Sequence, residues 1–512
     1  MGLWEITPRR VIFYVLWTAI HVGLFVFGYI KQKDDPELFV LDSLGASVFT
    51  SRGAGLVLAF DCALLLLPMC RNLIRYVRDF KPLNFIIPFD YNVYLHKCTA
   101  YAMLFFTLIH TNAHYVNFYR VEMMLFDALH LRNWQVHYTT WAGTTGHIML
   151  LFMFLIYTSA KIEVRHRNFE AFWFTHHLAI PFYLLLFYHS FGCFVHSTVT
   201  GQCKGYGSNF YTVPVFSIYI LERIIRELRA RQQTTLSKVI MHPGNTMEIQ
   251  FEKPSFQYKS GQYLFLSIPE VSKYQWHPFT ITSTPEEGFV SLHIRLVGDW
   301  TKASAKLLQS YSAQGSILKV DSPRLPTIRV DGPYGAPAED FYNYETAILI
   351  GAGIGVTPAA SLLKSVWYRH YRKAQMPLKK VYFFWVNRDK EAFEWFQSLL
   401  SSLEESVPTS FLEIHVYLTA KLSSDEIQNI VLHDADGVDP LTELQSRCHF
   451  GRPEWNRIFA GVRQAAANSV RDRKHEIGVF YCGPSPLASS LKQACNNATG
   501  GNITFTFRKE HF

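Results

Sequence analysis

The sequence predicts a multi-domain membrane protein, in which a bundle of six transmembrane helices is followed by a small β-barrel and then an α/β domain. Three observations support this prediction. Long apolar runs fill the first part of the 512-residue chain, whereas the rest has the mixed composition of a soluble α/β protein. Short alternating runs broken by Gly and Pro follow, and a glycine-rich turn lies between an apolar strand and a helix. The expected domains are 1–230, 231–338 and 339–512.

Six apolar segments approach the ~20 residues that a helix needs to cross a bilayer. The second and the sixth of them are marginal in length. We expect the six spans at 11–30, 54–70, 94–116, 143–160, 171–192 and 211–226.

Basic residues predict the orientation of these spans, because short cytosolic loops are enriched in Lys and Arg. Four basic clusters fall on one side of the membrane if the N-terminus is cytosolic. They lie within 9–10, 71–81, 161–167 and 223–231. Both termini are therefore expected in the cytosol, with the plasma membrane as the expected location and an internal membrane as the alternative. The modest net charge of +8 favours membrane lipid over nucleic acid as a partner.

Two cysteines fall in the last outer loop of this topology. A disulfide is permitted on that side of the membrane. The sequence leaves the bridged and the free forms of Cys193 and Cys203 equally open.

Histidines in the third and fifth spans are the main chemical signal, because ionisable side chains in lipid usually mark a pathway or a bound group. His96 and His110 are 14 residues apart. On an ideal helix this spacing gives ~21 Å of rise and only ~40° of rotation, so both rings point the same way. Span five carries His176, His177 and His189. Two helices with imidazoles at two depths can hold two haems, each iron taking one histidine from each helix.

The fifth span fits this arrangement only if its helix is interrupted. His176 and His189 are 13 residues apart, which places them on different faces of a straight helix. Pro181 lies between them and can supply a kink or a local unwinding. His177 is the alternative inner ligand. An iron with two histidine ligands has no open position, so it passes electrons without binding oxygen directly.

The stretch 252–301 indicates a small antiparallel barrel by its short alternating runs. Within it, HPFTITS offers hydroxyl and backbone N–H groups that can lie along a flavin, although this short pattern alone fits a plain barrel strand better. Arg295 is a counter-charge for a pyrophosphate. The candidate flavin-binding residues are His277, Pro278, Phe279, Thr280, Thr282, Ser283 and Arg295.

The segment ETAILIGAGIGVTPAASLLKSV places a glycine-rich turn between an apolar strand and a helix. Such a turn presents backbone N–H groups and a helix N-terminus to a phosphate. The next strand ends in Arg388, where a basic residue suits a 2′-phosphate and favours NADP over NAD, with Arg452 as a second candidate. Both arginines can also be ordinary surface charges. The candidates in the turn are Gly351, Gly353, Gly355, Thr357 and Pro358.

A later strand, GVFYCGPSPL, ends in Cys482, Gly483 and Pro484. In a doubly wound sheet this places the three residues at the carboxyl ends of the strands, where ligands bind. Cys482 is therefore either a neighbour of the nicotinamide or a structural core cysteine.

Together, the motifs resemble one family, the superoxide-generating NADPH oxidases of the phagocyte type. The resemblance rests on the membrane histidines, the terminal aromatic residue and the motifs FEAFWFTHHL, WHPFT, VGDWT, DGPYGAP, GAGIGVTP, FGRPEW and CGP, and it covers nearly the whole chain. It implies a ferredoxin-reductase-like barrel for FAD and an α/β domain for NADPH. It also implies that His96 and His176 bind an inner b-type haem, and that His110 and His189 bind an outer one.

The resemblance also implies catalytic roles. Arg52 and His114 would lie beside the outer haem and help to form the oxygen-reduction centre. Without the resemblance, Arg52 would be interpreted as a loop charge and His114 as a histidine at a helix end. Cys482 would border the nicotinamide, and Phe512 would stack on the flavin and move aside for hydride transfer.

The implied function is electron transfer from cytosolic NADPH through FAD and two haems to O₂, which forms superoxide on the opposite side. By likeness alone, the expected partners are a small transmembrane subunit, cytosolic organiser and activator proteins, and a Rac-type GTPase. One alternative is a ferric or metal reductase with the same electron chain. A second alternative is a channel-like or scaffold protein whose cytosolic half senses a ligand.

Overall fold

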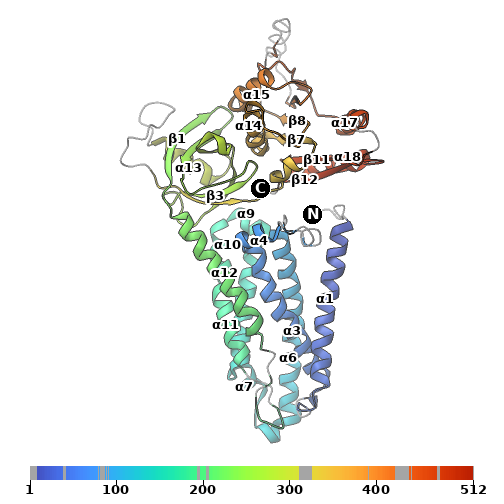
Figure 1. The fold of residues 1–512 in the computed structure, drawn as a ribbon. Helices are drawn as coiled ribbons and strands as arrows, with labels where there is room; N and C mark the ends of the chain where they lie inside the picture. The colour runs from blue at the N-terminus through green and yellow to red at the C-terminus, as the bar shows by residue number, and fades with distance from the viewer. Residues whose placement is uncertain are drawn as a thin grey trace. The chain divides into compact units, whose positions relative to one another are not determined.

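The computed structural model divides the chain into two compact units, Met1–Ile224 and Ile225–Phe512. Each unit is described by itself, with the elements labelled in Figure 1. The residues described are 8–38, 42–78, 80, 87, 89, 92–192, 197–202, 204, 207–310, 326–389, 391–420, 438–439, 441–469 and 473–510.

The first unit is a bundle of long helices that run alongside one another (Figure 1). The closest helix pairs are α3 with α6 and α1 with α3. The helices are α1 Pro8–Lys33, α3 Ala46–Leu66 with the 3₁₀ turn η1 Leu67–Met69, α4 Arg71–Arg78, α6 Asn92–Leu129, α7 Asn133–Tyr138, α8 Trp141–Ser159, α9 Ile162–Arg167, α10 Phe169–His176, α11 Ala179–Phe191 and α12 Asn209–Ala230.

Four helical segments of the described residues are long and apolar enough to cross a membrane, which agrees with a membrane protein. They are Val11–Lys33, Ala46–Met69, Trp141–Ser159 and Phe169–Phe191. The helices α6 and α12 occupy the other two predicted spans. Both carry polar or charged residues along their length, so composition alone does not identify them as spans.

Two sequence interpretations of helix ends are wrong. Helix α3 begins at Ala46 rather than near 54, so Arg52 lies inside a helix and not in a loop. Helix α6 continues to Leu129 rather than ending near 116, so His114 is not at a helix end. Apolar runs mark only the part of a helix that suits lipid, whereas backbone hydrogen bonding continues through polar residues wherever their side chains find partners.

The fifth predicted span is interrupted, and the interruption lies just before Pro181. Helix α10 ends at His176 and α11 begins at Ala179, so the proline falls in the first turn of α11. A proline is tolerated there because that N–H group has no partner within the helix. Around the break, the His177 N–H donates to the Phe174 carbonyl at 3.2 Å. The local unwinding therefore separates His176 from the helix that carries His189.

The barrel at the start of the second unit consists of two three-stranded antiparallel sheets, with strand orders β1-β2-β5 and β4-β3-β6. Leu264, Leu266 and Leu292 are fully buried between them. The elements are β1 Thr235–His242, β2 Thr246–Glu252, β3 Tyr263–Ser267, β4 His277–Thr280, the 3₁₀ turn η3 Pro285–Glu287, β5 Val290–Arg295, α13 Asp299–Ser310 and β6 Arg329–Tyr334.

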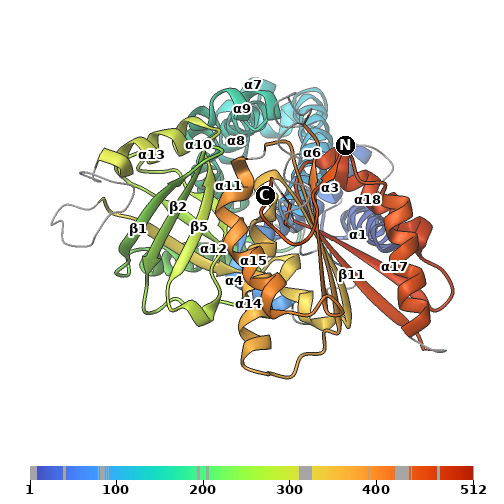
Figure 2. The same cartoon turned by 90° about the horizontal axis from the view of Figure 1, so that it is seen from above.

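The rest of the second unit is a parallel sheet with the order β10-β9-β8-β7-β11-β12, and it is covered by helices on both faces. Figure 2 shows α14 and α15 on one side and α17 and α18 on the other. The strand order reverses between β7 and β11, the position where such sheets bind ligands. The elements are η4 Pro337–Asn343, β7 Thr346–Ala352, η5 Gly353–Val356, α14 Thr357–Tyr371, β8 Lys380–Asn387, η6 Glu391–Phe393, α15 Glu394–Ser406, β9 Leu412–Leu418, β10 His449–Phe450, α17 Trp455–Ser469, β11 His475–Cys482, α18 Ser485–Ala498 and β12 Ile503–Lys509.

Candidate functional site

The first pair of membrane histidines is His96 on α6 and His176 at the end of α10. Their ring centroids are 6.2 Å apart, with the planes at 65°. The Nδ1 atom of His96 lies 2.9 Å from the Leu65 carbonyl oxygen. Because a carbonyl oxygen only accepts, this nitrogen carries the proton and Nε2 keeps its lone pair. The Nδ1 atom of His176 is buried and has no hydrogen-bond partner among the described residues.

His177 points elsewhere. Its ring is exposed, and its Nδ1 atom donates to the Trp173 carbonyl of the same helical turn at 2.7 Å. The structure therefore brings His176, and not the alternative His177, beside His96.

The second pair is His110 on α6 and His189 on α11, and both line one cavity of about 240 Å³. The Nδ1 atom of His110 donates to the Ser51 carbonyl at 2.9 Å, and that of His189 is 2.8 Å from the Thr145 hydroxyl. Glycines leave space beside both rings. A Cβ atom added at Gly55 would lie 3.5 Å from His110, and one added at Gly146 would lie 3.5 Å from His189.

The four histidines fit two metal centres with two imidazole ligands each. Two metal–nitrogen bonds of about 2 Å place the ring centroids on the order of 6 Å apart, which is close to the separation of His96 and His176. Ring nitrogens committed to backbone or hydroxyl partners are typical of metal-binding histidines, because these bonds fix the ring and its tautomer. The glycine-lined cavity beside His110 and His189 adds room for a flat group. These residues are thus compatible with b-type haem.

Arg52 and His114 line the cavity that holds His110 and His189. The guanidinium group of Arg52 donates to the Gln32 side-chain oxygen at 3.0 Å and to the Lys204 carbonyl at 2.6 Å. The His114 ring lies edge-on to His110, with 4.5 Å between centroids. Sequence reasoning missed Gln32, a buried amide that orients Arg52. Its only sequence signal was its place at the end of the first span.

In the barrel, the HPFT motif forms β4, as a flavin-facing strand requires. The His277 ring stacks on Trp300 of the VGDWT motif at 4.1 Å, and burial lowers the pKa of His277 to about 4. Thr282 and Ser283 are fully buried. Their hydroxyl groups hydrogen-bond inside the barrel, for example from Thr282 to the Ser291 carbonyl at 3.0 Å. These two residues shape the strand rather than line an open surface.

The strand that ends in Arg295 meets the glycine-rich turn. A Cβ atom added at Gly353, where φ is +57°, would lie 3.9 Å from the Arg295 guanidinium. A Cβ atom added at Gly355 would lie 2.3 Å from the Cys482 carbonyl oxygen, so only glycine allows the two turns to touch. The turns after β7 and β11 therefore form one continuous edge, and Arg295 lies beside it. The other turn candidates, Gly351, Thr357 and Pro358, are buried at the junction of β7 with α14.

Arg388 and Arg452 extend from the same edge of the parallel sheet. Arg388 follows β8 and Arg452 follows β10, and both are exposed. The register places Asn387 opposite Leu418 and Leu418 opposite Phe450, so the three strands end in one row.

Cys482 is a half-buried thiol at the end of β11, followed by Gly483 at φ +153° and by Pro484. Burial and the nearby Glu510 raise the pKa of the thiol, so it stays neutral at physiological pH. Glu510 is held by its N–H bond to the Tyr481 carbonyl at 2.9 Å. Phe512, Cys193 and Cys203 lie outside the described residues.

Three family models match the chain in this order. The model "Ferric reductase like transmembrane component" matches residues 54–187, "FAD-binding domain" matches 231–338, and "Ferric reductase NAD binding domain" matches 344–496. These matches confirm the predicted fold class and define a membrane-embedded flavoprotein oxidoreductase with a nicotinamide-nucleotide domain.

The relatives narrow this class. The chain is 37% identical to a superoxide-generating NADPH oxidase heavy chain of Dictyostelium discoideum over 99% of its length and 98% of that protein. It is 34% identical to mouse NADPH oxidase 1, covering 100% of this chain and 95% of that one. It is also 34% identical to human NADPH oxidase 3, over 100% of both. The chain belongs to the superoxide-generating NADPH oxidase family, as the motifs predicted.

Among solved structures, a ferredoxin NADP⁺ reductase from Neisseria gonorrhoeae with bound FAD and NADP matches 54% of this chain and 98% of its own. The TM-score is 0.36 at 13% identity.

Proposed function

We propose that this protein transfers electrons from NADPH to O₂ across the membrane and forms superoxide. The observation that supports this most is the pair of histidine tiers, His96 with His176 and His110 with His189, in a chain that also carries FAD and NAD domains. The expected 14-residue spacing on α6 gives the electrons two stopping points in the bilayer.

When bound, NADPH supplies a hydride, FAD converts it into single electrons, and two b-type haems carry these electrons through the bilayer. His96 and His176 hold the inner haem through their Nε2 atoms, and His110 and His189 hold the outer one. The carbonyls of Leu65 and Ser51 keep the α6 rings in the required tautomer.

At the outer tier, Arg52 and His114 attract the anion that forms when O₂ takes an electron. Both histidine ligands occupy the iron, so O₂ is reduced at the edge of the group and not on the metal. Gln32 and the Lys204 carbonyl hold the Arg52 guanidinium at the cavity wall. A fixed positive charge there stabilises the product without reorganisation.

In the second unit, the backbone of His277–Thr280 lies along the flavin and Arg295 pairs with its pyrophosphate. The Gly351–Pro358 turn binds the NADPH phosphates, and Arg388 with Arg452 binds the 2′-phosphate. Support comes from the continuous edge formed by the two turns and from the position of Arg295 beside it. In this proposal Cys482 borders the nicotinamide as a neutral thiol, with Gly483 and Pro484 shaping the turn, and Phe512 covers the flavin.

Six spans with both termini in the cytosol give the electron path its direction. The basic residues beside the spans support this topology. We further propose a plasma-membrane location, a small transmembrane partner protein, and activation by cytosolic organiser proteins and a Rac-type GTPase, all by family likeness.

NADPH-driven superoxide production in membranes tests the proposal, measured as cytochrome c reduction that superoxide dismutase suppresses. We expect activity in the wild type, with candidate activators present and absent, and its loss in His110→Leu. Full activity in that variant would contradict the outer-tier assignment. The second candidate, a ferric reductase, is favoured only by the name of the transmembrane family model. It predicts reduction of ferric chelates that superoxide dismutase leaves unchanged.

A further inference from the structure

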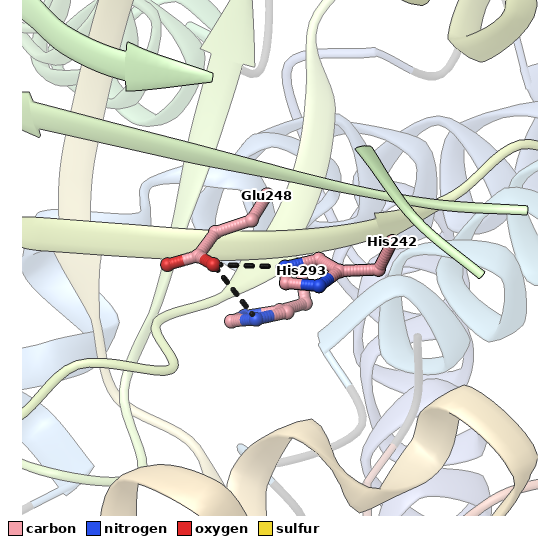
Figure 3. Close-up of side chains that lie close together, drawn as sticks. All are labelled: His242, Glu248 and His293. Carbon is pink, nitrogen blue, oxygen red and sulfur yellow. Dashed lines mark hydrogen bonds and ion pairs between the residues drawn. The ribbon is translucent and has the colours of Figure 1, made fainter. Parts of the chain in front are cut away.

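Three side chains of the barrel converge at a place that the proposed function does not use (Figure 3). His242 comes from the end of β1, Glu248 from β2 and His293 from β5. One potential ligand atom of each lies within 4.8 Å of the other two. The Oε2 atom of Glu248 is 2.9 Å from Nε2 of His242 and 3.5 Å from Nε2 of His293.

The strand register produces this convergence. Glu248 lies directly opposite His293 in the β2–β5 pair, and His242 lies opposite Thr246 in the β1–β2 pair. Residues two apart on a strand share a face, and opposite residues have Cβ atoms about 5 Å apart. The three side chains therefore meet on one face of the sheet because of backbone pairing that the whole barrel requires.

Neighbouring groups hold these side chains in place. The Thr282 hydroxyl is 2.8 Å from Nδ1 of His293, so Nε2 of that ring faces Glu248. Trp395 of α15 stacks on the His293 ring, with 4.1 Å between centroids. The Gln250 amide donates to the other oxygen of Glu248 at 2.6 Å. Partners of this kind, behind the ligand atoms, are typical of protein metal sites.

We propose that His242, Glu248 and His293 bind one zinc ion, with a water molecule as the fourth ligand. Two imidazoles and one carboxylate form a known zinc donor set that leaves one position open. Two zinc–nitrogen bonds of about 2 Å at a tetrahedral angle place the ring centroids roughly 5 Å apart, and those of His242 and His293 are 5.5 Å apart.

The three side chains combine burial with access. The Glu248 and His293 side chains are only 10% and 6% exposed, whereas that of His242 is 17% exposed and gives the ion an entry. The competing interpretation is a carboxylate–imidazole hydrogen bond with a proton in the place of the ion. Zinc would tie three strands together and, through Trp395, would also order the contact with α15. The proposal does not depend on the oxidase function.

The test uses the full-length chain, purified in detergent, stripped with EDTA and then titrated with ZnCl₂. Calorimetry gives the affinity, and elemental analysis after desalting gives the zinc retained per chain. The variants are His242→Ala and Glu248→Gln. The control is His370→Ala on α14, which packs near Phe411 and lies outside the cluster. Flavin and haem contents identify correctly folded preparations.

We expect the wild type and His370→Ala to retain one more zinc per chain than either cluster variant. We also expect each cluster variant to bind zinc at least tenfold more weakly. Zinc should raise the temperature of flavin release in the wild type and in the control only. Equal zinc retention in the wild type and both cluster variants, or no zinc retained by the wild type, overturns the proposal. So does an equal zinc-dependent shift in flavin release in all four proteins.

Discussion

Arg229 and Asp331 form a close ion pair in which the guanidinium of the last turn of α12 contacts the first carboxylate oxygen at 2.5 Å. Arg226, one turn earlier, donates to the second carboxylate oxygen at 2.8 Å. Only 2% of the Asp331 side chain is exposed. The Nζ atom of Lys253 reaches the carbonyls of Arg229 and Val330 at 2.7 and 2.8 Å. The end of α12 is therefore fastened to strand β6 by charge and by hydrogen bonds.

Asp331→Asn should lower the free energy of unfolding of the second unit by about 3 kcal/mol, because it leaves two partly buried guanidinium groups without their counter-charge. The control Glu227→Gln removes only an exposed pair with Arg231 and should cost less than about 1 kcal/mol. Thermal unfolding monitored by flavin release measures both. Equal effects of the two substitutions would contradict the anchoring role.

The same anchor predicts acid sensitivity. Burial alone would raise the pKa of Asp331, but Arg226 and Arg229 lower it below its usual value of 3.8. The carboxylate therefore contributes stability above the unfolded pKa, and this contribution is lost as the pH falls through the lower folded pKa. The stability difference between the wild type and Asp331→Asn should shrink below about pH 4. Unfolding at a series of pH values measures it.

His277 predicts a second pH dependence, in a different range. Its folded pKa of about 4 lies below the ordinary value of 6.5, so protonation favours the unfolded state. The stability contribution of the neutral ring is complete above pH 6.5 and is lost as the pH falls toward 4. Flavin retention should decline across this interval in the wild type and stay flatter in His277→Gln. An unchanged profile in the variant would exclude His277 as the group responsible.

The inner tier predicts that His96→Leu and His176→Leu each lose one of two haems. His177→Leu is the matched control, because its exposed ring bonds only within its own helix. Haem per chain, measured as the pyridine complex and normalised to flavin, distinguishes the variants. Loss of haem from His177→Leu together with retention in His176→Leu would reverse the assignment.

Gly355→Ala should destabilise the nucleotide edge by about 1–3 kcal/mol, because its Cβ atom would meet the Cys482 carbonyl oxygen at 2.3 Å. The control Gly461→Ala, in the middle of α17 with nothing within 4 Å of its added Cβ, should stabilise the protein by about 0.5–1 kcal/mol. KM for NADPH and flavin-release temperature should change in the first variant only. A normal KM in Gly355→Ala would show that the turn tolerates the side chain.

Much of the architecture follows from local patterns. Apolar runs, alternating runs and the glycine-rich turn each predict one part of the chain, because burial dictates residue type along every element. The spacing of His96 and His110 predicts that both face one way, and the helical geometry of α6 leaves little freedom to do otherwise.

Contacts between segments distant in the sequence could not be predicted in the same way. The bond between Gln32 and Arg52 depends on how α1 packs on α3, which no local pattern records. The choice between His176 and His177 depends on where α10 ends. Thr282 looked like a ligand group because hydroxyls suit a flavin, but the barrel buries it.

Helix α3 supplies the carbonyl groups that orient both α6 histidines. Ser51 accepts from His110, and Leu65 accepts from His96, so each pair of contacts is separated by 14 residues along its own helix. Any sliding of α3 along α6 would disturb both hydrogen bonds together. The reduction potentials of the two irons are thereby mechanically linked, and a partner that shifts one helix would retune the whole relay in a single movement.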